Sequence, residues 1–384
     1  MKVVSIVGAR PQFIKATPVS KVLAKIGIEE TLVNTGQHYD DNMSDLFFRE
    51  LGLREPDHNL GVGSGLHGQM TGRMLEKIER VLIDACPDCV LVYGDTNSTL
   101  AGALAAAKLK LPVAHVEAGL RSFRPTMPEE INRRLTDHVS SILLCPTATA
   151  IENLKKENVA STEIRTDCID IDDVKYLTSL QGPLVANVGD VMADILYRER
   201  DRPPKSALIK NLDAGSYALV TIHRAESTDD LDVLHCIVNA LISLSQKMPI
   251  LFPIHPRTAA VFENTGLNKR LEKATAISRV PPLGYNDFLM AQSKARIIIT
   301  DSGGVQKEAC IIGVPCLTLR DETEWVETVD SGWNRLLGSR AENLSEAAQT
   351  AQPPKSKLSN PFGDGHAAER IAAILKAFNF ESLK

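Results

Sequence analysis

The stretch "CVLVYGDTNSTLAGALAAAKL", residues 89–109, contains a short apolar run followed directly by an alanine-rich segment. Five consecutive apolar or aromatic residues predict a strand that is buried on both faces. Gly94 is typical of a turn, and residues 97–109 have the composition of a helix. The stretch therefore predicts a strand, a turn and a helix, with Asp95 at the carboxyl end of the strand.

The same pattern of strand, turn and helix recurs both before and after this stretch. In the first half, further strands are expected at residues 3–8, 29–36, 112–119 and 141–147. Helices are expected between them, at residues 11–27, 43–52, 70–85, 128–140 and 148–158. The pattern restarts near residue 217, with strands expected at 217–223, 249–256, 275–282, 295–304 and 315–319. Such a series implies parallel sheets covered by helices on both faces. We therefore expect two doubly wound α/β domains joined near residues 185–205.

The composition is that of a globular protein, with 43% hydrophobic and 24% charged residues in a chain of 384. The net charge is −5, from 43 basic and 48 acidic residues, and no basic block stands out, so nucleic-acid binding is not expected. No apolar run approaches the length of a membrane span, and "MKVVSIVGAR" indicates a buried strand rather than a signal peptide. These features predict a cytoplasmic protein that does not bind membranes.

Seven cysteines are scattered through the expected strands and helices. An odd and scattered set favours reduced thiols in the core over disulfides. The "CPDC" run at Cys86–Cys89 has redox or zinc spacing, but no second pair accompanies it. Its proline favours a break between a helix and a strand.

Chemically active residues gather at the expected strand ends. Ligands of doubly wound sheets bind beyond the carboxyl ends of the strands, and the cleft between two such domains is the expected site. A single Asp or Ser at such a position is more often a helix cap. Seven strand ends carry such residues, which makes it less suitable to explain all of them as helix caps. The set includes Arg10, Asp95, Glu117, His223, His255 and the run Asp301–Gly304.

Two turns have features of phosphate binding. Ser302, Gly303 and Gly304 precede an expected helix, whose N-terminal N–H groups favour an anion, and Glu308 one turn later could accept hydrogen bonds from a ribose. In the first half, "GARPQFIK" places Arg10 and Lys15 after a glycine turn. Neither a Walker loop nor a G-x-G-x-x-G fingerprint is present.

Neither a metal nor a cofactor is expected. The nine histidines include no H-E-x-x-H and no paired ligand spacing, and Asp95 and Glu117 lack the D-x-D spacing of a magnesium site.

Eight motifs match, in order and spacing, those of a known family. They are "GARPQFIK", "TGQHYD", "YGDTNSTLAGALAA", "HVEAGLRS", "MPEEINR", His223-Arg224 followed by Glu226, "DSGGVQKEA" and "NPFGDGHAAERI". Over nearly its whole length the chain resembles the non-hydrolysing UDP-N-acetylglucosamine 2-epimerases. The resemblance implies a GT-B architecture, two Rossmann-like domains around a cleft, with a C-terminal helix returning to the first domain. The implied domains are 1–185 together with 365–384, and 186–364.

The resemblance also implies a reaction, an isomerisation at C2 of a UDP-sugar without metal or nicotinamide. UDP leaves from C1 as a proton leaves C2, and both then add back with the proton delivered to the opposite face. Both faces of C2 need an acid/base group, which accounts for several carboxylates. Such enzymes serve polysaccharide biosynthesis and are commonly homodimers, so a homodimer is expected.

Residue by residue, the resemblance assigns catalysis to Asp95, Glu117, Glu129 and His223. It implies that the substrate is bound by Arg10, Lys15, Arg133, His255, Ser302, Gly303, Gly304, Glu308 and Arg320. Glu130 is expected only to cap its helix, because adjacent helical side chains point about 100° apart.

Two stretches depart from the family pattern. Residues 167–184 are interposed near the expected hinge, where a surface excursion is favoured over an oligomer contact or a partial lid. "TGQHYDDNM" and "LRDETEWVETVDSGWN" differ from the subgroup in which substrate also acts as an allosteric activator. The same features leave UDP-2,3-diacetamido-2,3-dideoxyglucuronate open as the substrate. A hydrolysing relative that releases N-acetylmannosamine is a further alternative, and a GT-B glycosyltransferase is disfavoured by the acids flanking C2.

Overall fold

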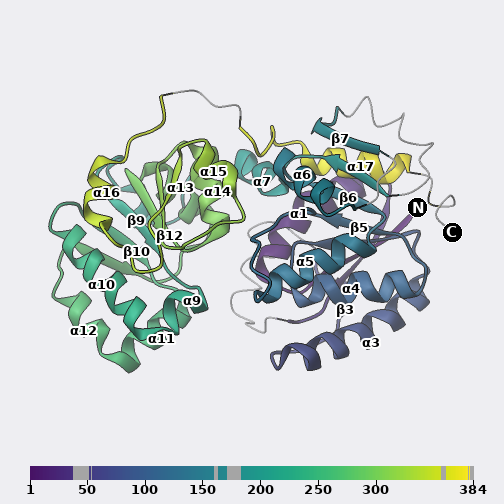
Figure 1. Ribbon diagram of the computed structural model, residues 1–384, viewed down its shortest axis with the longest axis horizontal. Helices are drawn as coiled ribbons and strands as arrows, with labels where there is room; N and C mark the ends of the chain where they lie inside the picture. Colours follow the sequence, from purple (N-terminus) through teal and green to yellow (C-terminus); the bar gives the residue numbers. More distant parts are fainter. Residues whose placement is uncertain are drawn as a thin grey trace. The chain divides into compact units, whose positions relative to one another are not determined.

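In the computed structural model, the chain forms two compact units (Figure 1). The structure describes residues 1–37, 52, 54–159, 163–170, 183–355, 360–378 and 380, with the backbone alone for Arg10 and residues 163–167. The first unit comprises Met1–Tyr197 and Pro361–Lys384, and the second comprises Arg198–Asn360. The chain thus leaves the first unit, builds the second, and returns.

The first unit contains one parallel sheet of eight strands in the order β3-β2-β1-β4-β5-β6-β8-β7. The strands are β1 (Lys2–Val7), β2 (Glu29–Asn34), β3 (His58–Asn59), β4 (Cys89–Tyr93), β5 (Val113–Val116), β6 (Ile142–Cys145), β7 (Glu163–Cys168) and β8 (Leu184–Asn187). Strands β4 and β5 lie side by side in parallel. The turns that carry Asp95 and Glu117 therefore leave the same edge of the sheet.

Helices cover both faces of this sheet because successive strand residues point to opposite sides. From β1, Val3 and Val7 pack into one apolar cluster, while Val4 and Ile6 pack into another. The first cluster includes residues of α1 (Arg10–Lys25) and α17 (Ala367–Ala377). The second includes residues of α3 (His67–Ala85) and α4 (Asn97–Lys108). The other helices in the described part of this unit are α5 (Pro128–Val139) and α6 (Ala148–Lys156), with α7 (Val191–Glu199) running across the division.

The second unit repeats the design with six parallel strands in the order β11-β10-β9-β12-β13-β14. They are β9 (Ala218–Thr221), β10 (Ile250–Pro253), β11 (Ile277–Val280), β12 (Ile297–Thr300), β13 (Cys316–Thr318) and β14 (Asn334–Leu336). Its helices are α8 (Ala207–Lys210), α9 (Ala225–Thr228), α10 (Leu231–Ser245), α11 (Pro256–Thr265), α12 (Leu267–Glu272), α13 (Tyr285–Lys294), α14 (Gly303–Ile312), α15 (Val326–Asp330) and α16 (Leu344–Thr350). Residues of α10, α12 and α16 pack on one face of the sheet, and residues of α8, α13 and α14 pack on the other.

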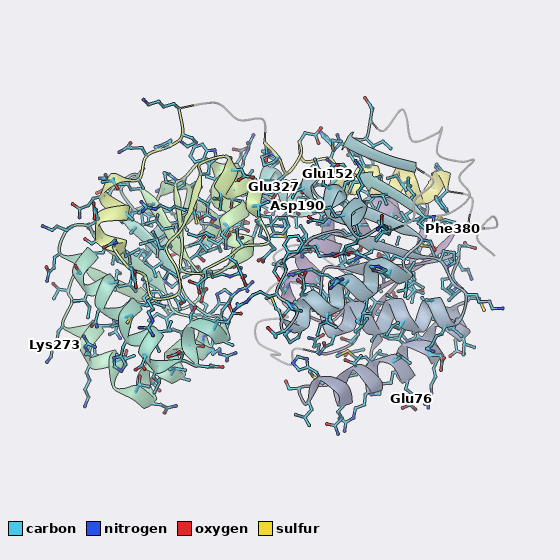
Figure 2. The ribbon with its side chains drawn as sticks, viewed as in Figure 1. Glu76, Glu152, Asp190, Lys273, Glu327 and Phe380 are labelled. Atoms are coloured by element: carbon cyan, nitrogen blue, oxygen red, sulfur yellow. The ribbon has the colours of Figure 1, made fainter. Side chains whose placement is uncertain are left out.

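The last helix, α17, returns to the first unit and packs against α1 (Figure 1). Ile371, Ile374 and Leu375 are fully buried in the same apolar cluster as α1 and the sheet. Phe380, labelled in Figure 2, continues this packing against Phe378, with ring centroids 5.1 Å apart. The N-terminus of α17 is held by the Asp194 carboxylate, which accepts from the N–H groups of Ala367 at 3.0 Å and Ala368 at 2.7 Å.

Stability should depend on pH through Asp194. Burial raises the pKa of this carboxyl from 3.8 to about 6, although the two backbone N–H groups act in the opposite direction. Its stabilising contribution is complete below pH 3.8 and is lost as pH rises through about 6. Two pKa units correspond to up to about 3 kcal/mol. We expect the free energy of unfolding of wild type, relative to Asp194→Asn, to fall over this interval in urea titrations; a pH-independent difference would contradict the assignment.

The division between the units falls at Tyr197, within the expected joint of residues 185–205 and beyond the implied boundary at residue 185. The reason is strand β8, which pairs with β6 and with β7 inside the first sheet instead of opening the second. Strand β7 (Glu163–Cys168) begins before the interposed stretch 167–184, ends at its second residue and forms the edge of the sheet. Residues 171–182 of that stretch, and His38–Asp40 of "TGQHYD", lie outside the described residues.

The cysteines correct one expectation, since they are not all core thiols. Cys86 and Cys168 are exposed, whereas Cys89, Cys145, Cys310 and Cys316 are buried, and all seven are free. In "CPDC", Cys86 ends α3 in a left-handed conformation and Cys89 begins β4. The break between helix and strand is confirmed, and burial raises the pKa of the Cys89 thiol, which disfavours a thiolate there.

Candidate active site

The first turn of the sheet is fixed by a buried glutamine that sequence reasoning missed. Gln12 Oε1 accepts from the N–H groups of Gly8 at 2.9 Å and Ala9 at 3.0 Å. Its Nε2 donates to the Tyr93 carbonyl at 2.7 Å, at the end of β4. This bridge ties the turn before Arg10 to the strand that leads to Asp95. The side chain of Arg10 itself lies outside the described part of the structure.

Lys15 and Glu117 form an ion pair in the first unit. Both side chains are largely buried, and Glu117 has a left-handed backbone with φ of 72° directly after β5. Such a conformation is unfavourable for a residue with a Cβ and recurs at functional sites. A Cβ on Gly94 would lie 3.2 Å from Lys15 Nζ and 3.3 Å from Glu117 Oε2. The turn after β4 therefore lies directly against this pair.

Asp95 is held by Arg133, which comes from α5. Arg133 Nη2 donates to Asp95 Oδ2 at 2.6 Å, and Nη1 donates to Glu130 Oε2 at 3.0 Å. The arginine is buried, whereas about a third of the Asp95 side chain (31%) is exposed. Asn132 Nδ2 also donates to the Asp95 carbonyl at 2.9 Å. Arg133 was expected to face the substrate, and in this structure it is engaged by two carboxylates.

The adjacent acids Glu129 and Glu130 have different surroundings. Glu130 is buried, and its carboxylate accepts from the N–H groups of Ser122 at 2.8 Å and Phe123 at 3.2 Å, besides Arg133. It therefore anchors the loop before α5 instead of capping the helix, whose N-cap residue is Met127. Glu129 is half-buried in the first turn of α5, and within the described residues its carboxylate has no hydrogen-bond or ion-pair partner.

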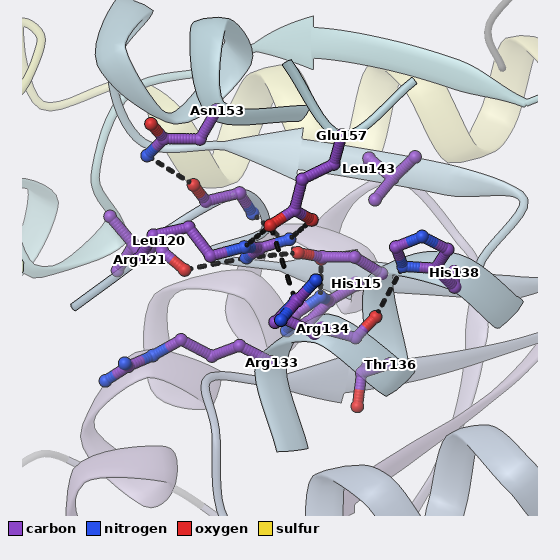
Figure 3. Close-up of polar contacts among 12 residues, drawn as sticks. His115, Leu120, Arg121, Arg133, Arg134, Thr136, His138, Leu143, Asn153 and Glu157 are labelled. Atoms are coloured by element: carbon purple, nitrogen blue, oxygen red, sulfur yellow. Dashed lines mark hydrogen bonds and ion pairs between the residues drawn. The ribbon is translucent and has the colours of Figure 1, made fainter. Parts of the chain in front are cut away.

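Behind these turns lies a buried ionic network (Figure 3). His115 Nδ1 lies 2.7 Å from Asp137 Oδ1, and Arg121 Nη1 lies 2.7 Å from Asp137 Oδ2. Arg121 also donates to both oxygens of Glu157, at 2.9 and 2.7 Å. Burial opposes ionisation of Asp137, but the hydrogen bonds and charges of His115 and Arg121 hold the pKa of this carboxyl below its ordinary value. Sequence patterns did not single out these residues.

In the second unit, His223 follows β9 and faces Asp301, which follows β12. Asp301 is fully buried and accepts from the N–H groups of His223 at 3.0 Å and Arg224 at 2.9 Å, with His223 Nδ1 at 3.3 Å. Burial alone would raise the pKa of Asp301, but His223 and these N–H groups hold it below 3.8. The ring of His255 lies 5.6 Å from that of His223. The structure thus brings both predicted histidines together.

The Ser302 turn begins α14, with Ser302 at the N-cap position. A Cβ on Gly303 would lie 2.5 Å from Glu324 Oε1, so only glycine fits beside that carboxylate. Glu324 in turn pairs with Arg320 at 2.9 Å and Arg224 at 3.5 Å. Two arginines and a helix N-terminus therefore meet at one carboxylate, a group that shares with phosphate a negative charge and oxygen atoms that accept hydrogen bonds.

Glu308 lies one helical turn further along α14 and is buried. Its Oε2 accepts from Gln292 Nε2 at 2.7 Å. Burial, together with the nearby Glu308 carboxylate, raises the pKa of the Tyr285 phenol. The predicted ribose acceptor is thus a carboxylate oriented by α13, which carries both Gln292 and Tyr285.

The described residues contain no group of three or more His, Cys, Asp and Glu side chains arranged to hold a metal ion. Within the same ranges, no helix is both long and apolar enough to span a bilayer.

Comparison with known proteins gives a consistent result. Residues 21–376 match the family described as UDP-N-acetylglucosamine 2-epimerase. A UDP-N-acetylglucosamine 2-epimerase of Methanocaldococcus jannaschii is 44% identical over 379 residues, covering 98% of this chain and 99% of that protein. A UDP-2,3-diacetamido-2,3-dideoxy-D-glucuronate 2-epimerase of Pseudomonas aeruginosa is 46% identical over 380 residues, with the same coverage. The crystal structure of M. jannaschii UDP-GlcNAc 2-epimerase with UDP-GlcNAc and UDP is 42% identical, with a TM-score of 0.85 over 98% of this chain and 99% of that one.

The fold and the family match define a UDP-sugar 2-epimerase of the non-hydrolysing kind, an isomerase. The chain belongs to the UDP-N-acetylglucosamine 2-epimerase family. The expected fold class is confirmed, because both sheets are parallel and doubly wound in the GT-B-like manner and the C-terminal helix contacts α1.

Proposed function

We propose that this enzyme interconverts UDP-N-acetylglucosamine and UDP-N-acetylmannosamine. The observation that carries the proposal is the set of three carboxylates at one edge of the first sheet and on α5: Asp95, Glu117 and Glu129. Inversion at C2 needs proton transfer on both faces of that carbon, which one carboxylate cannot provide. The similarity to the M. jannaschii enzyme, which is named for this substrate, supports the choice.

The proposed reaction is an anti elimination of UDP followed by re-addition of UDP with the proton placed on the opposite face of C2. A carboxylate removes the proton from C2, the bond between C1 and the UDP oxygen breaks, and a C1–C2 double bond forms in 2-acetamidoglucal. A proton is then delivered to the opposite face of C2 while UDP adds back to C1. Positive charge develops near C1 as UDP departs, so carboxylates around C1 and C2 stabilise the transition state.

The environments of the acids suggest different tasks. Asp95 and Glu117 are each paired with a cation, Arg133 and Lys15, whereas Glu129 has no such partner among the described residues. We propose that Arg133 acts on the substrate through Asp95, because it is buried and bound to two carboxylates. In the same way, Lys15 would act on the substrate through Glu117. Lys15 would bind diphosphate only after this ion pair rearranges.

The second unit is proposed to bind UDP. His223, oriented by Asp301, would stabilise the departing diphosphate, with His255 beside it. The N-terminus of α14 at Ser302, Gly303 and Gly304 would bind phosphate oxygens, and Glu308 the ribose. Arg320 would exchange its Glu324 partner for phosphate.

A second substrate is favoured by one specific observation. The P. aeruginosa relative named for UDP-2,3-diacetamido-2,3-dideoxy-D-glucuronate is 46% identical over 98% of this chain. That sugar carries a further acetamido group and a carboxylate, and the same acids would epimerise it at C2. Offering both UDP-sugars at equal concentration and comparing kcat/KM decides between them.

Deuterated water provides the direct test of the mechanism. We expect UDP-N-acetylglucosamine and its product, recovered at equilibrium, to carry deuterium at C2, because the proton that returns comes from an enzyme group in exchange with solvent. NMR or mass spectrometry of the recovered nucleotide sugars measures this. Product that retains its original hydrogen at C2 would contradict elimination, and accumulation of free N-acetylmannosamine with UDP would identify a hydrolysing enzyme.

A further inference from the structure

The network of His115, Asp137, Arg121 and Glu157 lies in the first unit, and the reaction proposed above assigns it no role. The side chains of His115, Arg121 and Asp137 are fully buried. Placing three ionisable groups out of contact with water is expensive unless each is paired, and each of them is. An apolar core would avoid this desolvation cost, so we expect the network to have a function besides stability.

Both ring nitrogens of His115 face acceptors. Nδ1 lies 2.7 Å from Asp137 Oδ1, and Nε2 lies 2.8 Å from the carbonyl oxygen of Gly94. A carbonyl cannot donate, and Asp137, which also pairs with Arg121, has its pKa held low. The ring therefore lies between two acceptors, and Nε2 donates to the Gly94 carbonyl.

The network reaches both turns that carry the predicted acids. Gly94, whose carbonyl accepts from His115, immediately precedes Asp95 and has a left-handed φ of 64°. Asp137 Oδ2 accepts from the N–H of Gly119 at 3.2 Å, two residues after Glu117. Gly94 is also the residue whose Cβ position lies within 3.3 Å of Glu117 Oε2. The buried pair of His115 and Asp137 thus holds the backbone beside both acids.

We propose that His115 is a positioning residue for the epimerisation, which sets the orientation of Asp95 through the Gly94 carbonyl. The inference rests on the proposed function, since it assigns a role to His115 only through Asp95. A hydrogen bond from a fully buried ring to this carbonyl is strengthened by the low local dielectric and restricts movement of the turn that carries Asp95. Misplacement of an acid by about 1 Å lowers turnover by up to roughly 100-fold.

Two uncharged variants separate positioning from stability. In His115→Gln, the amide nitrogen falls near Nε2 and can still donate to the Gly94 carbonyl. In His115→Asn, the amide falls near Nδ1, so the bond to Asp137 is kept and the bond to Gly94 is lost. We expect kcat to fall at least about 10-fold for Asn and to recover to within about 3-fold of wild type for Gln. KM and the affinity for UDP should change little in either variant.

The melting temperature of both variants serves as the control, because both replace the buried imidazole by an amide and should be destabilised alike. Glu157→Gln provides a matched variant at the far end of the network, next to Arg121. It should lower stability without lowering kcat. Equal kcat in the Asn and Gln variants, or a fall in kcat for Glu157→Gln as large as that for Asn, would overturn the proposal.

If the Asn variant does not fold, Asp137→Asn takes its place. That change leaves an acceptor for His115 Nδ1 but removes the charge that holds the ring, and kcat should fall while UDP affinity persists; an unchanged kcat would overturn the proposal. Wild type is assayed alongside for deuterium at C2. If the product of wild type carries no deuterium at C2, the proposed function is refuted. If wild type is active and the variants do not differ in kcat, only the role of His115 is refuted.

Discussion

The Asp95→Asn substitution is expected to lower turnover of UDP-N-acetylglucosamine by at least roughly 100-fold while the protein folds and binds UDP. The amide occupies the same space, and its oxygen can still accept from Arg133 Nη2, which lies 2.6 Å from Asp95 Oδ2. The backbone contact from Asn132 to the carbonyl of residue 95 is also retained. Only the ability to exchange a proton with the substrate is lost. Steady-state kinetics with calorimetry of UDP binding measures the two effects separately.

The strand itself supplies the control. Asp88 precedes β4 at the opposite end from Asp95, is half-buried, and accepts from the N–H of Lys2 at 2.8 Å. Asp88→Asn makes the same chemical change on the same strand and should leave turnover unaltered. Near-normal turnover in Asp95→Asn would remove Asp95 from the acid/base set. Loss of UDP affinity together with turnover would indicate a binding role instead.

The Gly119→Ala substitution is expected to destabilise the first unit by roughly 4 kcal/mol, the sum of about 1 kcal/mol for a left-handed backbone and about 3 kcal/mol for a steric clash. Gly119 has φ of 80°, and an added Cβ would lie 2.4 Å from the carbonyl oxygen of Ala150 and 2.8 Å from its carbonyl carbon. These are backbone atoms of α6 and cannot move aside as a flexible side chain would. Urea unfolding measures the loss.

The Gly27→Ala substitution separates the cost of the steric clash from the cost of the left-handed backbone. Its φ of 77° is almost the same, but nothing lies within 4 Å of an added Cβ. Gly27→Ala should therefore cost only about 1 kcal/mol. Similar losses at the two positions would mean that α6 shifts to accommodate the methyl group. In that case the turn after Glu117 is less tightly packed than the structure indicates.

Much of the fold could be predicted because strands buried on both faces are written as continuous apolar runs. "CVLVY" became β4 and "VAHV" became β5, each with its predicted acid in the turn that follows. The two-residue strand β3 could not be predicted, since two residues carry no periodicity. The assignment of β8 to the first sheet also needed the structure, because an apolar run does not specify which sheet it joins.

The sequence predicted which residues lie at the candidate site, but not which partners they bind. Sequence motifs placed Asp95, Arg133 and Glu130 near one another, but not the hydrogen bonds that separate a buried anchor from an accessible acid. The pairing of Arg121 with Glu157 joins residues 36 positions apart, and no local pattern signals it. Asp301 was recognised as a strand-end residue, while its role in orienting His223 depends on β9 and β12 being neighbours.

The place of α17 in the first unit has a consequence for biosynthesis. The chain is synthesised from its N-terminus, so the strands of the first unit leave the ribosome well before the helix that covers one face of their sheet. The second unit, which is continuous in sequence, can reach its final structure while the nascent chain is still growing. The first unit must wait for Ile371, Ile374 and Leu375, and until then an apolar surface beside α1 stays open to chaperones.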